Sequence, residues 1–432
     1  MLAGCLLLGG CRETVEPSKI VVVLLDTLRA DALGVYGREP ETAPFLSELA
    51  SEAAVFEHAY STSSWTAPSV ASLFTSTYPW QHGVTLGFHA HRWQGKRLWE
   101  QKKTTIPLNR IDDGLATWAE LFSQAGYPTY GLASNRNISS ELAFDRGFDR
   151  FLHKYQATMA EFYLDLAGWK EELNRSRPYF LYLHFNDIHE PYEIVQPAYE
   201  IQLCCAEESE ARYLSQVAYV DHWLESILTL LEWDESTLLV VLSDHGEEFG
   251  EHGGSGHGPQ LYTELNRVVA ILYGPGLGIR PQRIAANVSL IDILPTVLDL
   301  AGIEPPDQAQ GLSLASILKL DSQRHSVVEK LRDRILLAHR LDQTRPGREI
   351  TAGIQGPWKL VRENQGDLEL YDHRTDPGEH QDIIDQYPRE ARELSHEMDR
   401  LLMAIDKPSS EQIEIPVDET LLEELEALGY VN

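Results

Sequence analysis

A loop rich in hydroxyl side chains leads into an apolar, helix-compatible run at residues 63–75, which read SSWTAPSVASLFT. Pro68 suits the first turn of a helix, where its missing N–H costs nothing. Such a turn exposes a hydroxyl, that of Thr66 or Ser69, close to a helix N-terminus. The free N–H groups and partial positive charge there suit an anionic substrate. Because Ser or Thr before Pro is also an ordinary helix start, this stretch needs support from elsewhere in the chain.

Acidic and imidazole side chains follow two apolar, strand-like runs. Residues 21–25 (VVVLL) end at Asp26, and residues 238–242 (LLVVL) are followed closely by Asp244 and His245. Open α/β sheets bind their ligands at the C-terminal ends of the strands. A polar loop that begins with a capping Asp is the alternative explanation of the second run. The two runs together with the hydroxyl loop favour a ligand site.

These three stretches resemble the sulfatase family of the alkaline phosphatase superfamily. The signature of that family has the form Cys/Ser-x-Pro-Ser-x-x-x-Leu-x-Thr. The corresponding residues here are Thr66-Ala67-Pro68-Ser69, followed by Leu73 and Thr75. The resemblance extends from Lys19 to about Ile383. It implies an α/β, alkaline-phosphatase-like fold and a sulfatase-like ester hydrolase or phosphotransferase.

The candidate metal ligands are two carboxylates, one imidazole and one hydroxyl, from Asp26, Asp244, His245 and Thr66. Oxygen ligands with one nitrogen suit Zn²⁺ or Mn²⁺, whereas Ca²⁺ and Mg²⁺ are possible but less favoured by the histidine. A divalent ion would lower the pKa of the Thr66 hydroxyl and neutralise a substrate oxygen. We therefore expect a metal-dependent enzyme with Thr66 as its nucleophile.

The departures from the family pattern bear on the mechanism. Sulfatases carry a Cys or Ser that is oxidised to formylglycine, and Thr66 cannot give that aldehyde because its β-carbon bears a methyl group. Val70 stands in place of the usual Arg, Thr27 in place of a second Asp, and His245 in place of the commoner Asn. The remaining set looks more like the phosphoethanolamine and phosphoglycerol transferases, which use a Thr nucleophile.

The resulting hypothesis is a hydrolase or transferase that acts on a phosphate or sulfate ester, with the phosphoester favoured. The ester could belong to a glycan or a lipid head group. One alternative is a sulfuric ester hydrolase that works without formylglycine. Another is a non-catalytic binding lipoprotein on the same scaffold, against which the retained acidic and imidazole residues argue.

Further histidines are assigned by the resemblance. His189 matches a substrate-facing histidine that could bind the anion or protonate the leaving oxygen, and His257 falls where sulfatases place a cationic anion-binding group. Structural roles are the alternative for both residues. His252 matches a segment of the family, but a structural role explains it equally well. The aliphatic part of the Lys359 side chain is expected to pack on a C-terminal sheet. Asn135 stands where sulfatases usually have a Lys-containing segment, which leaves that anion contact open.

The alternation of strand and helix signals predicts a largely parallel sheet covered by helices on both faces. Near residue 320 the pattern changes to short antiparallel strands followed by a helix. The expected organisation is therefore a signal and tether at 1–18, a sulfatase-like catalytic domain at 19–320, and a C-terminal subdomain with an acidic tail at 321–432.

The first residues, MLAGCLLLGGCR, resemble a lipoprotein-type signal with Cys11 as the lipidated residue. A cytoplasmic protein with an apolar N-terminus is the alternative. The formal net charge is −30, which disfavours nucleic acid as a partner and leaves lipid as the means of membrane attachment. Cys204 and Cys205 are adjacent, and adjacent cysteines rarely form a disulfide with one another because the geometry is strained. No disulfide framework is therefore expected. We expect an exported bacterial-type lipoprotein of the periplasm or outer membrane.

Overall fold

The structure is a computed structural model. It describes residues 16–88, 105–192, 208–257, 260–342, 345, 347–364, 366–406, 412–417 and 421. The predicted lipidation site Cys11, the polar excursion at 89–103, and Cys204 and Cys205 lie outside these residues. Across the part of the chain that is described, no helix is long and apolar enough to cross a membrane.

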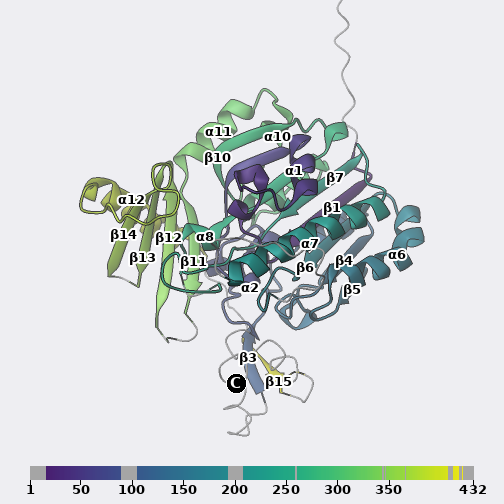
Figure 1. Ribbon diagram of the computed structural model, residues 1–432, viewed down its shortest axis with the longest axis horizontal. Coiled ribbons are helices and arrows are strands. Elements are labelled where there is room, and N and C mark those ends of the chain that lie inside the picture. Colours follow the sequence, from purple (N-terminus) through teal and green to yellow (C-terminus); the bar gives the residue numbers. More distant parts are fainter. Residues whose placement is uncertain are drawn as a thin grey trace, which may run out of the picture.

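A mixed, mostly parallel sheet of nine strands forms the centre of the molecule (Figure 1). Eight strands follow the order β10-β2-β9-β7-β1-β6-β4-β5, and β8 pairs with β2. Strand β1 pairs in parallel with both β6 and β7, whereas β9 runs antiparallel to its neighbours β2 and β7. The strands are β1 Lys19–Leu25, β2 Ala54–Tyr60, β4 Thr129–Ala133, β5 Arg150–His153, β6 Tyr179–Phe185, β7 Thr237–Leu242, β8 Arg267–Val268, β9 Ala270–Tyr273 and β10 Gln282–Ser289.

The sheet is hydrophobic on both faces because helices cover both of them. In β1, Ile20, Val22 and Leu24 pack into one core cluster, and the alternating Val21, Val23 and Leu25 pack into the other. Successive residues of a strand point to opposite faces, so an unbroken apolar run marks a strand with both faces buried. The predicted strand at the start of the chain is confirmed.

Helix α2 packs on the first face, and helices α6 and α7 on the second. Apolar residues of α2 join the cluster of Ile20, while those of α6 and α7 join the cluster of Val21. Figure 1 shows α6 and α7 lying along the same side of the sheet. The helices are α1 Pro44–Ser51, α2 Thr66–Thr75, α3 Pro79–His82, α5 Trp118–Gln124, α6 Met159–Arg175, α7 Glu208–Leu230, α8 Thr263–Asn266, α9 Ile293–Leu300, α10 Ala315–Lys319, α11 Arg324–Asp333 and α12 Pro388–Ala404.

A second, smaller sheet lies beside the central one and is antiparallel throughout, as the sequence predicts. Its strands are β11 Leu336–Leu341, β12 Glu349–Gln355, β13 Trp358–Glu363 and β14 Asp367–Asp372. Leu394 and Met398 of α12 pack on this sheet against Leu337 and Leu360. In Figure 1, β11 is its strand nearest the centre of the molecule.

Local sequence patterns predict that Thr42 caps the helix before Pro44 and that a second helix spans 115–125, and both predictions were wrong in detail. Thr42 is not the N-cap of α1, because its hydroxyl donates instead to the carbonyl of Ala32, and Ala43 takes the cap position. The helix expected from Leu115 begins only at Trp118, after a capping box made by Thr117 and Glu120.

One pairing between distant segments was not predicted. Strand β3 (Thr105–Asn109) pairs antiparallel with β15 (Gln412–Pro416), which lies in the segment expected to be only an acidic tail. The two strands are about three hundred residues apart in the chain, and no local pattern in either one indicates its partner.

Candidate active site

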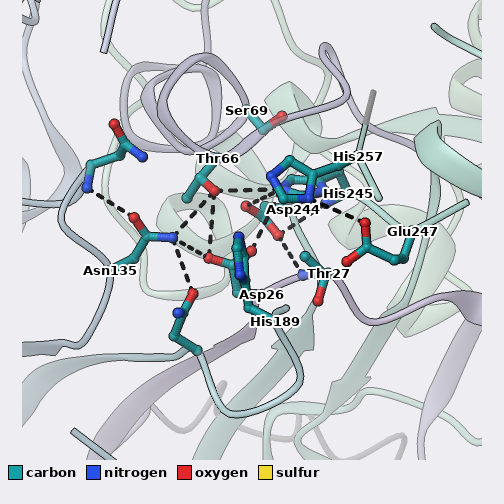
Figure 2. A network of polar contacts seen from close by, with 12 residues as sticks. Asp26, Thr27, Thr66, Ser69, Asn135, His189, Asp244, His245, Glu247 and His257 are labelled. Carbon is teal, nitrogen blue, oxygen red and sulfur yellow. Dashed lines mark hydrogen bonds and ion pairs between the residues drawn. The ribbon is translucent and has the colours of Figure 1, made fainter. Parts of the chain in front are cut away.

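The predicted metal ligands meet at the C-terminal edge of the central sheet (Figure 2). Asp26 directly follows β1, Asp244 and His245 follow β7, and Thr66 begins α2. Because β1 and β7 are adjacent and parallel, their C-terminal ends bring the two aspartates to the same edge. The hydroxyl of Thr66 lies 3.4 Å from Asp26 Oδ2 and 3.4 Å from His245 Nε2.

The ring nitrogen Nε2 of His245 is surrounded by three oxygen atoms. Asp26 Oδ1 and Asp244 Oδ2 each lie 3.5 Å from it, and Thr66 Oγ1 lies 3.4 Å from it. Ligands of a tetrahedral ion with bonds of about 2.1 Å are about 3.4 Å apart. The three distances from His245 Nε2 therefore match the spacing between neighbouring ligands of a small divalent ion.

The two aspartates are fully buried and incompletely satisfied. Asp26 Oδ1 and Asp244 Oδ2 accept no hydrogen bond from the described residues. Burial raises the pKa of Asp26 to about 7, reinforced by the neighbouring Asp244, and burial also raises the pKa of Asp244 to about 7. Each of these buried carboxylates has one oxygen atom without a hydrogen bond in the described part of the chain, which suits the binding of a cation. A bound cation would keep both groups ionised.

The tautomer of His245 suits metal binding. Its Nδ1 lies 2.9 Å from the carbonyl oxygen of Gly246, to which only a protonated nitrogen can donate. The lone pair of Nε2 then faces the two aspartates. Burial lowers the pKa of His245, which keeps the ring neutral. A backbone contact that fixes the orientation of a ligating histidine is typical of metal sites.

His184 is a further candidate ligand that the sequence analysis missed. It offers a nitrogen in one group with Asp26 and Asp244, in which all ligand atoms lie within 4.8 Å of one another. Its Nε2 is 3.5 Å from Asp26 Oδ2, and neither ring nitrogen has a hydrogen-bond partner among the described residues. Burial lowers the pKa of His184 to about 3. The only signal in the sequence was a histidine near the end of an apolar strand, and its register partner Leu24, two residues before Asp26, is known only from the structure.

Asn135 belongs to the same hydrogen-bond network. Its Nδ2 donates to Asp26 Oδ2 at 2.6 Å and lies 3.3 Å from Thr66 Oγ1. It also donates to Asn186 Oδ1 at 3.1 Å. Asn135 follows β4 and Asn186 follows β6, so both residues extend from the same sheet edge as the aspartates.

The two histidines assigned by resemblance stand over the cluster. The rings of His189 and His257 are 4.8 Å apart, and those of His257 and His245 are 4.9 Å apart. Together with Thr66 and Asn135, His189 and His257 line a small cavity. The Nδ1 of His257 lies 3.2 Å from Oε1 of the buried Glu247.

Two other residues singled out in the sequence lie in a separate polar cluster. His252 contacts Glu264 at 2.7 Å and stacks on Tyr262, as a structural histidine would. Lys359 is buried on β13 and pairs with Glu379 at 2.8 Å. Neither residue belongs to the group around Thr66.

The backbone beside the ligands is constrained. Thr27 has φ +60°, an uncommon conformation for a β-branched residue. Its N–H donates to Asp244 Oδ1 at 3.3 Å, and its carbonyl accepts from the hydroxyl of Tyr213 at 2.9 Å. Backbone strain of this kind persists only where the surroundings fix it, as they commonly do at functional sites.

Comparisons with known proteins agree with this fold. A family model described as Sulfatase matches residues 18–303, and one described as N-sulphoglucosamine sulphohydrolase, C-terminal, matches residues 259–407. The protein is therefore an ester hydrolase of the alkaline phosphatase superfamily. Within that superfamily, the chain belongs to the sulfatase family.

Individual relatives are similar over most of their length. A Δ4,5-hexuronate-2-O-sulfatase of Bacteroides thetaiotaomicron is 24% identical over 444 residues, which cover 88% of this chain and 87% of the relative. The structure of a protein in complex with its substrate D-glucosamine-2-N,6-O-disulfate aligns with a TM-score of 0.70 and 17% identity, over 92% of this chain and 100% of that one. A phosphonate monoester hydrolase of Agrobacterium radiobacter aligns with a TM-score of 0.69 and 16% identity, over 93% and 100%.

Proposed function

We propose that this sulfatase-family enzyme cleaves a phosphate or sulfate ester through a covalent intermediate on Thr66, with the phosphoester preferred. The observation that carries the proposal is the position of Thr66 Oγ1, 3.4 Å from both Asp26 Oδ2 and His245 Nε2, at the start of α2. The hydroxyl thus lies beside an acceptor for its proton and next to the free N–H groups of a helix N-terminus.

Asp26, Asp244, His245 and Thr66 would hold a divalent ion, with His184 as a further ligand. Zn²⁺ or Mn²⁺ suits this set of oxygen and nitrogen donors best. When bound, such an ion supplies Lewis-acid stabilisation of negative charge and lowers the pKa of a neighbouring hydroxyl.

In the first step the Thr66 oxygen forms a bond to phosphorus and the bond from phosphorus to the alcohol oxygen breaks. The leaving oxygen needs a proton, and His189 or His257 on the cavity wall is placed to donate it. In the second step water or an alcohol attacks the phosphothreonine in line. Thr66 is released, and phosphate or a transferred phosphoester departs.

Thr66 favours phosphorus over sulfur for a chemical reason. A sulfated hydroxyl is hard to discharge unless a second hydroxyl on the same carbon can expel sulfate by collapsing to a carbonyl. Threonine has only one hydroxyl, whereas a phosphothreonine can be displaced directly by a nucleophile. The fold shared with a phosphonate monoester hydrolase fits this preference.

Sulfate ester hydrolysis without formylglycine is the second candidate. It is favoured by the matching family model and by curated relatives that are sulfatases. The substrate of one structural neighbour is a sulfated sugar, so a sulfated or phosphorylated glycan is the natural first class to assay.

The deciding experiment is turnover of matched aryl phosphate mono- and diesters and aryl sulfates, with Zn²⁺ or Mn²⁺ added. Thr66→Ala and Thr66→Ser are compared with Thr375→Ala, which changes an exposed threonine far along the chain. Intact mass spectrometry of enzyme trapped with a slow phosphodiester should show an adduct on Thr66, and the added mass names the transferred group. Turnover of sulfates alone, or full activity of Thr66→Ala, would contradict the proposal.

We further propose that the enzyme is exported and anchored to a membrane by lipid at Cys11. The motif LGGC at residues 8–11 supports this. Metabolic labelling with a fatty acid in a bacterial host should label the wild type and not Cys11→Ser. Equal labelling of both would refute the anchor.

A further inference from the structure

Arg340 is a buried arginine with guanidinium nitrogens that lack a hydrogen-bond partner among the described residues. Only 4% of it is exposed, and its Nε and Nη1 donate no hydrogen bond within the described residues. Other arginines in and around the small sheet are paired: Arg348 with Glu363, Arg362 with Asp399 and Arg334 with Asp292. Arg340 is the exception among these neighbours.

An unpaired buried guanidinium is costly, because charge leaves water without compensation. Burial lowers the pKa of Arg340 to about 10, so the group is still a cation at neutral pH. The nearby charge of Asp342 raises the pKa of Arg340, but among the described residues Asp342 accepts no hydrogen bond from Nε or Nη1 of Arg340. Asp342 Oδ2 lies 3.3 Å from Arg348 and 3.4 Å from Arg345. A positive charge maintained at such a cost suggests an anion that arrives from outside the chain.

The location of Arg340 connects it to the nucleophile. Strand β11 is attached to the loop before α2, because the N–H of His339 donates to the carbonyl of Thr62 at 2.8 Å and the hydroxyl of Ser63 donates to the carbonyl of His339 at 2.7 Å. The guanidinium of Arg340 lies 5.4 Å from the centre of the Trp65 ring. Trp65 directly precedes Thr66 and lines the same cavity.

A second cation is held against an aromatic ring in this cavity wall. Arg136 and Phe88 both line the cavity, and the guanidinium of Arg136 lies 4.6 Å from the centre of the Phe88 ring. Guanidinium groups packed on aromatic faces keep their donors in a fixed plane, which suits planar or bidentate recognition of an anion. Arg136 thus places a positive charge on the wall of this cavity and Arg340 places another against its wall residue Trp65, in a protein whose net charge is −30.

We propose that Arg340 binds a second anionic group of the substrate, a carboxylate, sulfate or phosphate, beside the ester that Thr66 cleaves. The natural substrate is then a molecule with at least two negative groups, one at Thr66 and one over Trp65. This inference rests on the proposed function for the identity of the cleaved ester. It adds a specificity-determining residue contributed by the small C-terminal sheet.

The test compares three esters of one sugar: a hexose with a single sulfate or phosphate, the corresponding hexuronate, and the hexose with two such esters. In the wild type, kcat/KM should be higher for the dianionic esters. In Arg340→Gln, the ratio of dianionic to monoanionic kcat/KM should fall about ten- to hundredfold, the range expected for losing a charged hydrogen bond. Arg340→Lys should keep part of the ratio, and the exposed Arg280→Gln is the matched control. If Arg340→Gln lowers kcat/KM more for the hexuronate than for the diester, the second group is a carboxylate. The opposite result identifies a sulfate or phosphate.

Stability gives an independent readout, because a purely structural Arg340 would lower the melting temperature when replaced. We expect Arg340→Gln to melt at or above the wild-type temperature, since an uncompensated charge is removed. Calorimetric titration of Thr66→Ala with the same three sugars, with and without Arg340→Gln, measures the selectivity without turnover. If no ester is turned over but selective binding depends on Arg340, the proposed function fails and this inference stands. An unchanged ratio in Arg340→Gln, or equal binding of all three sugars, overturns the inference.

Discussion

The side-chain amide of Asn135 donates a 2.6 Å hydrogen bond to Asp26 Oδ2, the oxygen that lies 3.4 Å from the hydroxyl of Thr66. The same amide nitrogen is 3.3 Å from Thr66 Oγ1 itself. Asn135 therefore holds both the carboxylate and the nucleophile from one side. Because it lines the cavity, its amide can also face an oxygen of the substrate.

Replacing Asn135 with Ala should lower kcat more than it raises KM. Removing a donor that faces developing negative charge costs about 10²- to 10³-fold in kcat. Steady-state kinetics on the best aryl ester measures this effect. Asn137→Ala, which changes a second amide on the same cavity wall, is the control and should retain more activity. Equal losses in the two variants would assign Asn135 no special role.

Sequence patterns were sufficient for the parts of the site that local rules determine. Asp26, Asp244 and His245 follow apolar strands, which indicated a site at one edge of a parallel sheet, and the resemblance to the sulfatase signature selected Thr66 as the hydroxyl beside them. The three-layer fold followed from strands that are apolar on both faces.

The parts that were missed depend on contacts between distant segments. His184 lies inside an apolar strand, and only the register of β6 against β1 shows that it reaches Asp26. The residues beside Arg340 in the sequence do not show whether its guanidinium is paired. That becomes clear only from the structure, in which β11 lies beside Thr62. The pairing of β3 with β15 is another long-range contact that no local pattern specifies.

Chelation should both inactivate and destabilise the enzyme. Asp26 and Asp244 are buried next to one another, and a bound cation would compensate their charge. Added metal at about 100-fold over its Kd should raise stability by about 2.7 kcal/mol. Differential scanning calorimetry after dialysis against a chelator, followed by addition of Zn²⁺, Mn²⁺, Ca²⁺ or Mg²⁺, tests this and ranks the metals.

The matched variant for the metal experiment is Asp244→Asn, which removes one carboxylate charge and keeps the shape of the side chain. It should bind less metal, as measured by elemental analysis, and its melting temperature should respond less to added ions. A wild-type protein whose melting temperature and activity are both unaffected by chelator and metals would contradict a metal site in this cluster.

The buried pair of Lys359 and Glu379 should be required for the stability of the smaller sheet. Lys359 Nζ lies 2.8 Å from Glu379 Oε2 and 3.1 Å from Asn266 Oδ1, and both charged residues are almost fully buried. Removing one partner leaves an unpaired buried charge, so Lys359→Met should lower the free energy of unfolding by about 3–5 kcal/mol.

Changing both partners, as in Lys359→Met with Glu379→Gln, should restore much of that loss, because no unpaired charge remains. Urea denaturation of the wild type, the two single variants and the double variant completes the cycle. Strictly additive losses would mean that the two side chains do not stabilise each other.

The stability of the protein should depend on pH through Asp221, a buried carboxylate away from the active site. Its two carboxylate oxygens accept from the backbone N–H groups of Phe45 and Leu46, at the start of α1. Burial nevertheless raises the pKa of Asp221 from 3.8 to about 6, and the carboxylates of Glu41 and Glu225 add to the shift.

Because the folded pKa of Asp221 is the higher one, the folded protein binds more protons at this site than the unfolded chain between pH 3.8 and about 6. The contribution of Asp221 to stability is therefore greatest below pH 3.8 and declines as the pH rises through about 6, by up to about 3 kcal/mol.

Asp221→Asn removes this titration, but it also removes one hydrogen-bond acceptor. The informative quantity is therefore the slope of the unfolding free energy against pH, not its absolute value. Urea denaturation from pH 4 to 7 should show a less negative slope in Asp221→Asn than in the wild type or in the exposed control Asp307→Asn. Parallel curves for all three proteins would mean that Asp221 ionises as readily in the folded protein as in water.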